Sequence, residues 1–288
     1  MKTKHLSKLL GVLFLLLVST NSFAITPVGS REYKLLLEPT LFNGSNPELM
    51  VAAFWTDLDQ LIQTTIVRPT AGSFTLNKTR TVKFYDTTPT CLLYANNLVF
   101  REREENSIRE VTLKYRSFDR YVSAHQDMSG TESDALTKFE EDISAAYSIK
   151  YSHSTTQGIS ATKNLNKMDD PVRLYPGLLN YNFDDTQAIS LVGDLTVLEL
   201  VYKGTSVDLG SENGDFSLTL WYNIVDLSMP AVAEVSFKYK DADGYYSKNV
   251  VTRAQDLFKS MQTMDTWLAT NSISKTAFVY NYDQNFCQ

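Results

Sequence analysis

Apolar and polar residues alternate along several segments of the chain, which is the pattern of strands with one buried face. Most of these segments are separated by polar turns or by turns that contain Gly, Pro or Asn. The predicted strands are Glu32–Leu37, Thr79–Tyr85, Leu98–Arg103, Ile108–Arg116, Phe139–Ser144, Leu195–Tyr202, Phe216–Val225 and Ala233–Lys240. This pattern indicates an α+β, mainly β chain whose eight antiparallel strands close into a barrel, because closure removes unpaired edges.

Helical periodicity is clearest in two longer segments, which we expect to flank the sheet. Pro47–Val67 and Val250–Ala269 place apolar residues mostly at three- and four-residue spacings. A weaker helical pattern covers Ser133–Phe139, whereas Ser152–Asn182 is too irregular to assign. Because no obvious linker divides the chain, we predict a single domain over residues 25–288.

Charged residues occupy alternate positions in several predicted strands, and alternate side chains share one face of a strand. For one strand alone, charges that face solvent are the default interpretation. Because five predicted strands carry charged residues at alternate positions, the pattern favours a barrel whose charged faces line a tunnel and whose apolar faces are covered by the helices. The charged sets are Glu32 and Lys34; Arg101 and Arg103; Lys114 and Arg116; Lys138, Glu140 and Asp142; and Glu234 and Lys238.

The overall charge of the chain is acidic, with 27 Lys and Arg against 33 Asp and Glu and a formal net charge of −6. Residues 1–24 hold three lysines and no acidic residue, so the remainder has 24 basic against 33 acidic residues and a net charge of −9. Such a chain is not expected to bind nucleic acid or an anionic membrane surface. Any basic function has to come from Lys and Arg concentrated locally.

The N-terminus has the three parts of a secretory signal peptide. Lys2, Lys4 and Lys8 precede the apolar run Leu9–Val18, and small residues up to Ala24 offer a cleavage position. A membrane anchor is the alternative, but this run is only about half of the roughly 20 residues that span a bilayer. We therefore expect residues 1–24 to be removed, the chain to be exported to a bacterial periplasm or secreted, and no stable membrane insertion afterwards.

The chain has two cysteines, Cys91 and Cys287. Two are too few for a disulfide scaffold or a cysteine metal cluster. In an oxidising compartment they could form a disulfide between the C-terminal tail and the loop that follows Asp86. Two separate thiols are the alternative, because the sequence does not give the distance that decides between them.

The charged segments resemble those of the CYTH family and occur in the family's order. These proteins are the triphosphate tunnel metalloenzymes, which include thiamine triphosphatases, RNA triphosphatases, inorganic tripolyphosphatases and one class of adenylate cyclase. Ser274-Lys275-Thr276 before a β-like Ala277–Tyr280 is also similar to the family's C-terminal end. The segments that carry the resemblance are Glu32-Tyr33-Lys34-Leu35, Tyr85-Asp86-Thr87-Thr88-Pro89, Leu98-Val99-Phe100-Arg101-Glu102-Arg103, Thr112-Leu113-Lys114, Lys138-Phe139-Glu140-Glu141-Asp142 and Ala233-Glu234-Val235-Ser236-Phe237-Lys238.

The resemblance implies an eight-stranded antiparallel tunnel that binds an anionic, phosphorylated ligand. It implies phosphate contacts from Lys34, Arg101, Arg103, Lys114, Lys203 and Lys238. It implies Mg²⁺ or Mn²⁺ ligands from Glu32, Glu140, Asp142 and Glu234, of which Glu140 and Asp142 would also be catalytic. The metal would position the attacking water.

The acidic part of the family pattern is incomplete, and this keeps three functions open. Ser30 and Ser236 stand where the family has glutamates, and each missing carboxylate weakens a magnesium site. The favoured function is an exported, metal-assisted phosphohydrolase that acts on a polyphosphorylated small molecule or short polyphosphate. The second is a non-catalytic protein that binds a phosphate-bearing polyanion and has a degenerate metal site. The third is a barrel with surface charges and an unrelated interaction role.

Overall fold

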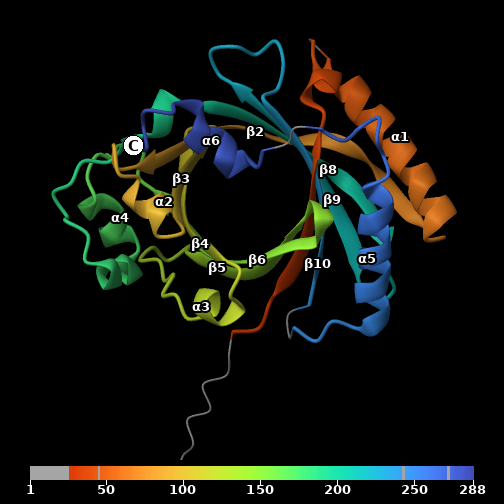
Figure 1. The fold of residues 1–288 in the computed structure, drawn as a ribbon, viewed down its shortest axis with the longest axis horizontal. Coiled ribbons are helices and arrows are strands. Elements are labelled where there is room, and N and C mark those ends of the chain that lie inside the picture. Colours follow the sequence, from red (N-terminus) through yellow and green to blue (C-terminus); the bar gives the residue numbers. More distant parts are fainter. Residues whose placement is uncertain (1–25, 45, 242–243, 271–272) are drawn as a thin grey trace, which may run out of the picture.

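The computed structural model describes residues 26–44, 46–241, 244–270 and 273–288. The predicted signal peptide therefore lies outside the described residues. The strands in the described ranges form one sheet in the order β3-β4-β6-β5-β1-β10-β9-β8-β2-β7. β3 also pairs with β2, so all the strands except β7 close into a ring (Figure 1). We call the inside of this ring the tunnel.

The ring is antiparallel throughout except between β1 and β5, which run parallel. The mainly β tunnel with flanking helices is confirmed, but the ring has one strand more than the eight expected and contains this parallel pair. β7 (Ser190–Leu191) pairs only with the end of β2. The ring strands are β1 (Ser30–Leu37), β2 (Thr70–Asp86), β3 (Leu98–Glu105), β4 (Ile108–Ser117), β5 (Leu136–Ser144), β6 (Ser148–Ile159), β8 (Val197–Asp208), β9 (Asn213–Asn223) and β10 (Val232–Lys240).

The additional strand, β6, has no alternation of apolar and polar residues in its centre. The segment 152–157 is polar throughout, and all of it except Thr156 is buried. Its hydroxyls find partners on the neighbouring strands: the Thr155 and Thr137 oxygens are 2.7 Å apart, and those of Thr156 and Thr112 are 2.8 Å apart. Because these groups are hydrogen-bonded, they can be buried without the apolar pattern by which a strand is recognised.

Two long helices, α1 and α5, cover one side of the ring (Figure 1). α1 confirms the first predicted helix, whereas α5 ends at Met261 and not at Ala269. The apolar spacing continues past α5 because Met264 and Leu268 pack on the same core without being helical. The helices are α1 (Pro47–Thr65), α2 (Leu92–Ala95), α3 (Arg120–Ala124), α4 (Asp169–Leu174), α5 (Lys248–Met261) and α6 (Lys275–Tyr282), with short 3₁₀ helices at Pro39–Phe42, Ala145–Tyr147, Pro176–Tyr181 and Val192–Asp194.

Two short predicted elements have the wrong type. The helix expected over Ser133–Phe139 is wrong, because β5 begins at Leu136. The β-like interpretation of Ala277–Tyr280 is also wrong, because these residues lie in α6, where the Ser274 hydroxyl accepts a hydrogen bond from Ala277 N at 3.2 Å. A short apolar run fits either structure, and here contacts with the rest of the fold decide.

The apolar core lies outside the ring, between the strands and the helices. On one side, Tyr33 and Phe237 pack with Phe54 of α1 and Phe258 of α5. On the other side, apolar residues of β3 and β4 pack against α4 and the 3₁₀ helix that follows it. Since alternate residues of a strand face opposite ways, the charged positions face the tunnel.

The C-terminal helix α6 packs at one end of the ring. Val279 and Tyr280 of α6 belong to an apolar cluster with Trp221 of β9. The Cys91–Cys287 disulfide then ties the C-terminal tail to the segment between β2 and α2, with a Cα–Cα distance of 5.4 Å. The described residues include no helix that is long and apolar enough to cross a bilayer.

Candidate functional site

Charged side chains of both signs line the tunnel, and every predicted site residue lies at an inward position. The strand register places such residues side by side on one face of the sheet. Lys34 on β1 lies beside Ser236 on β10, Ser236 lies beside Ser217 on β9, and Ser217 lies beside Lys203 on β8. The inward basic residues include Lys34, Lys78, Arg80, Arg101, Arg103, Lys114, Arg116, Lys203 and Lys238, and the inward acidic residues include Glu32, Glu105, Glu140, Asp142, Glu199 and Glu234.

Three of the predicted metal carboxylates come together where β1 and β5 run parallel. The register places Glu32 beside Asp142, and Glu140 lies two residues before Asp142 on the same face. Lys34 Nζ is 2.8 Å from Asp142 Oδ1 and 3.0 Å from Glu32 Oε2, and Lys238 Nζ is 2.7 Å from Glu140 Oε1. Burial opposes ionisation of Glu32, but the charges of Lys34 and Lys238 outweigh it and lower its pKa to about 2.

These carboxylates, as placed, do not fit a divalent metal. Within the described ranges, no group of three His, Cys, Asp or Glu side chains is arranged to hold an ion. Magnesium and manganese require several oxygen ligands, whereas lysine ammonium groups occupy the carboxylate oxygens here. The fourth predicted ligand, Glu234, lies elsewhere on β10, with its Oε1 2.9 Å from Lys275 Nζ of α6. No metal-dependent step follows from this arrangement.

A cluster of guanidinium groups lies on the part of the wall formed by β2, β3 and β8. Its centre is Glu199, whose side chain is 1% exposed. The Glu199 carboxylate accepts hydrogen bonds from Arg80 Nε, from Arg103 Nη2 at 3.3 Å and from Trp221 Nε1 at 2.9 Å. Burial opposes its ionisation, but the charges of Arg103 and Arg80 hold its pKa well below the usual range.

Arg101 lies beside this cluster and forms no ion pair with any described residue. Its Nε atom, like that of Arg103, is buried and has no hydrogen-bond partner. Burial, and then the charge of Arg103, lower the pKa of Arg101, although a guanidinium stays protonated in proteins. A buried N–H donor of a cation is unfavourable when it has no partner, and an anion bound in this part of the tunnel would supply one.

Further cations are available on β4 and β8. Arg116 Nη2 is 2.9 Å from Asp142 Oδ2, whereas Lys114 Nζ is 3.8 Å from the same oxygen. Burial lowers the pKa of Lys114 to about 7, which Asp142 offsets only in part. Partial desolvation, and then the charges of Lys238 and Arg80, lower the pKa of Lys203, although much of this residue is open to solvent. Lys114 is thus only weakly paired, and a ligand could contact it.

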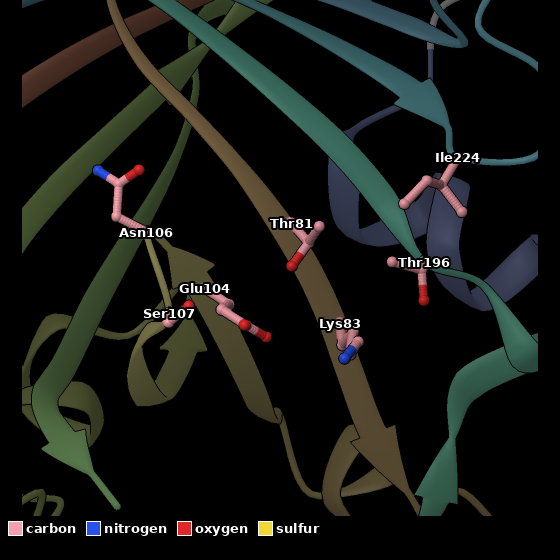
Figure 2. Close-up of a pocket in the computed structure, with 7 residues that line it drawn as sticks. All are labelled: Thr81, Lys83, Glu104, Asn106, Ser107, Thr196 and Ile224. Atoms are coloured by element: carbon pink, nitrogen blue, oxygen red, sulfur yellow. The ribbon is translucent and has the colours of Figure 1, made fainter. Parts of the chain in front are cut away.

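A cavity of about 190 Å³ opens beside the guanidinium cluster at the β3–β4 turn. It is lined by Lys78, Arg80, Arg103, Glu105, Asn106, Ile108 and Glu110. A larger hollow of about 410 Å³ is shown in Figure 2 and is lined by Thr81, Lys83, Glu104, Asn106, Ser107, Thr196 and Ile224. Because Lys83 and Glu104 alternate with the inward residues of β2 and β3, this hollow lies on the outer face. It contains none of the predicted site residues.

The residues of the guanidinium cluster and its cavity that sequence reasoning missed include Lys78, Arg80 and Glu199. Lys78 and Arg80 have the same two-residue spacing as the other charged pairs, but the predicted strand began at Thr79 and so contained only one of them. Glu199 is a lone charge between apolar neighbours, and nothing in the sequence relates it to the arginines. The spacing could have revealed the first two, whereas only the three-dimensional structure reveals the third.

No family model and no curated protein matches the sequence. Similar solved structures include a candidate adenylyl cyclase from Hippeastrum with a dominant triphosphatase activity, at 14% identity and a TM-score of 0.43 over 88% of this chain and 95% of that one. A candidate adenylate cyclase from Bacillus halodurans has 12% identity and a TM-score of 0.40 over 87% and 98% of the two chains. The PH1819 protein from Pyrococcus horikoshii has 11% identity and a TM-score of 0.34 over 87% and 100%.

The likeness is too distant to transfer an activity, so the side chains of this tunnel have to indicate what the chain binds.

Proposed function

We propose that this chain binds a phosphorylated polyanion, such as a short linear polyphosphate or a polyphosphorylated small molecule, inside the tunnel. The observation that supports this most directly is the half-buried Arg101, whose buried Nε has no hydrogen-bond partner and whose guanidinium has no carboxylate partner among the described residues. Arginine forks bind phosphate oxygens in pairs, and lysine adds point charge. Arg103 and Lys114 supply such groups next to Arg101.

The arrangement of the cations favours a ligand with several negative charges. Lys34 and Lys238 lie on β1 and β10, whereas Arg80, Arg101 and Lys114 lie on β2, β3 and β4. The basic groups therefore approach the tunnel from opposite parts of the ring. A single phosphate can contact only some of these Lys and Arg side chains, whereas a linear polyanion can contact basic groups on both sides of the tunnel.

The proposal is tested by titrating the purified chain with tripolyphosphate in a calorimeter, with inorganic phosphate as the comparison ligand. We expect tripolyphosphate to bind more tightly and Arg101→Ala to weaken it at least about tenfold, because charge-assisted hydrogen bonds contribute about 1.5–3 kcal/mol. The matched control is Arg173→Ala, which removes an exposed arginine of α4 that pairs with Asp169. Absence of wild-type binding, or equal losses in the two variants, would contradict the proposal.

Metal-assisted hydrolysis of the same ligand is a second candidate. It requires a metal ion to displace the ammonium groups of Lys34 and Lys238 from Glu32, Glu140 and Asp142, which share one face where β1 and β5 meet. Phosphate release should be measured with Mg²⁺, with Mn²⁺ and with a chelator. Metal-dependent release that Glu140→Gln abolishes without loss of binding would support hydrolysis, whereas tight binding without release would leave a binding protein.

We also propose that the chain acts outside the cytoplasm. The pattern of residues 1–24 supports this, and the Cys91–Cys287 disulfide is compatible with an oxidising compartment. Expression of the full chain in a bacterium, followed by fractionation and intact mass measurement, tests the proposal. The expected product is a periplasmic or secreted chain that begins near Ile25, and an uncleaved cytoplasmic chain would contradict it.

A further inference from the structure

Glu199 is the most buried carboxylate among the tunnel's ion pairs, and it is neither a predicted phosphate contact nor a predicted metal ligand. We infer that Glu199 is a positioning residue of the anion site: it anchors Arg80 and Arg103 with their free N–H groups available to the ligand, and it does not contact the ligand itself. This inference rests on the proposed polyanion binding and explains how two of its cations are held.

Each of the two arginines gives Glu199 only part of its hydrogen-bonding capacity. Arg80 donates through Nε to Oε2, and Arg103 donates through Nη2 to Oε1 at 3.3 Å. In the described part of the chain, neither guanidinium forms another hydrogen bond to protein, and the buried Arg103 Nε has no partner at all. A guanidinium has five N–H donors, so both groups keep donors for phosphate oxygens.

A third contact fixes the carboxylate independently of the arginines. Trp221 Nε1 donates to Glu199 Oε1 at 2.9 Å, and the Trp221 side chain is 1% exposed. The indole is itself held, since the Phe84 ring packs edge-on against it at 6.1 Å between centroids and Lys275 Nζ lies 5.4 Å from its centroid. Glu199 is therefore an anchor with a fixed direction.

Positioning and simple charge balance predict effects of opposite sign. If Glu199 only balanced charge, its removal would make the tunnel more positive and would strengthen anion binding. If Glu199 positions the arginines, its removal frees two long side chains that must be ordered again when the ligand binds. Binding should then weaken although the net charge has become more favourable.

The decisive experiment measures tripolyphosphate affinity of the Glu199→Gln chain by calorimetry. Glutamine keeps the shape and can still accept the Trp221 hydrogen bond, but it loses the charge that holds the two guanidinium groups. We expect binding at least about tenfold weaker than in the wild type, which is the loss of about one charge-assisted hydrogen bond. Equal or tighter binding would overturn the inference.

Glu102→Gln is a matched control on the neighbouring strand. Glu102 lies between Arg101 and Arg103, is 2% exposed, and accepts from Arg109 Nε at 2.6 Å and from Tyr85 Oη at 2.8 Å. It points away from the tunnel, so its neutralisation changes the charge and disturbs a buried pair without releasing a tunnel arginine. We expect less than about a twofold change in affinity. A loss equal to that of Glu199→Gln would mean that any buried charge change has this effect, and would overturn the inference.

A double-mutant cycle separates positioning from a general loss of structure. Arg103→Ala should weaken binding strongly in the wild type but much less in the Glu199→Gln chain, because Arg103 is no longer held there. Additive losses would overturn the inference. If Glu199→Gln does not fold, Glu199→Asp retains the charge and shortens the side chain, and an unchanged affinity in that variant would overturn it.

The two proposals fail in distinguishable ways. If the wild-type chain does not bind tripolyphosphate, the proposed function fails and the role of Glu199 fails with it. If the wild type binds and Arg101→Ala does not, while Glu199→Gln binds as tightly as the wild type, only the positioning role is wrong.

Discussion

Four tunnel carboxylates each lie against an ammonium or guanidinium group, and the loss of these ion pairs at low pH should destabilise the fold. The pKa of Glu32, Glu140, Asp142 and Glu199 is lowered in the folded chain, because basic neighbours outweigh the effect of burial. A group whose pKa is lower in the folded than in the unfolded chain stabilises the fold above its unfolded pKa, and this stabilisation is lost as the pH falls.

We therefore expect the melting temperature to fall steeply as the pH drops from about 4, near the unfolded pKa of glutamate, towards about 2. Thermal unfolding followed by circular dichroism at half-unit pH steps measures this. Glu199→Gln should have a shallower pH dependence, because it removes one of the four groups. A melting temperature that is constant over this interval would mean that the ion pairs contribute little to stability.

Single residues also mark the limit of what the sequence could predict about the site. Arg101 and Arg103 were predicted from their spacing, and the structure places both at the tunnel wall. That Arg103 has a partner and Arg101 has none was not predictable, because the partner is Glu199, 96 residues further along the chain from Arg103. The sequence identifies inward charges, but the pairing depends on which strands become neighbours.

The elements show a similar division between what was predictable and what was not. Strands with an apolar face against a helix were recognised, whereas β6 was not, because its buried centre is polar and its partners lie on β4 and β5. The type of α6 was wrong because its short apolar run fits a strand as well as a helix. Contacts between distant segments decide both cases.

The disulfide and α6 form one unit at the end of the ring, and its removal should destabilise the fold. The two cysteines are separated by 196 residues, and loss of a native disulfide typically reduces the free energy of unfolding by about 2–5 kcal/mol. We expect such a loss for the Cys91→Ser/Cys287→Ser double variant, measured by chemical denaturation against the oxidised wild type. The reduced wild type should match the double variant. Equal stability of all three forms would contradict the expectation.

Tyr280 gives a finer test of how α6 is attached. Its hydroxyl donates to Asp86 Oδ2 at 2.9 Å, and Asp86 is fully buried, with the backbone N–H groups of Thr87, Leu93 and Tyr94 as its other partners. Tyr280→Phe removes only this hydroxyl, so we expect a loss of about 1–3 kcal/mol in the free energy of unfolding. Tyr282→Phe, at a half-exposed position of the same helix, should cost less, and the reverse order would contradict the role of Asp86.

The molecule as a whole combines an acidic exterior with a basic interior, and this should decide which polyanions it binds. The formal net charge is −6, yet cations gather inside the ring. We expect tripolyphosphate to bind and duplex DNA not to bind, because a duplex cannot enter the tunnel and meets an acidic surface. Fluorescence anisotropy with labelled DNA and calorimetry with tripolyphosphate, both at 50 and 200 mM salt, test this. Tight DNA binding would place the basic surface outside the tunnel.

The position of β1 has a consequence for the order in which the chain can fold. β1 is the first strand of the ring, and it lies between β5 and β10, the last strand. Its Arg31 bonds to Glu141 and to Tyr239, residues that are 110 and 208 positions away. During synthesis β1 therefore cannot complete its pairing until β10 has been made, and the edge of β1 that pairs with β10 stays unpaired until then. Completion of the ring is a late event, and a nascent chain that stops before β10 has no closed tunnel with which to capture an anion.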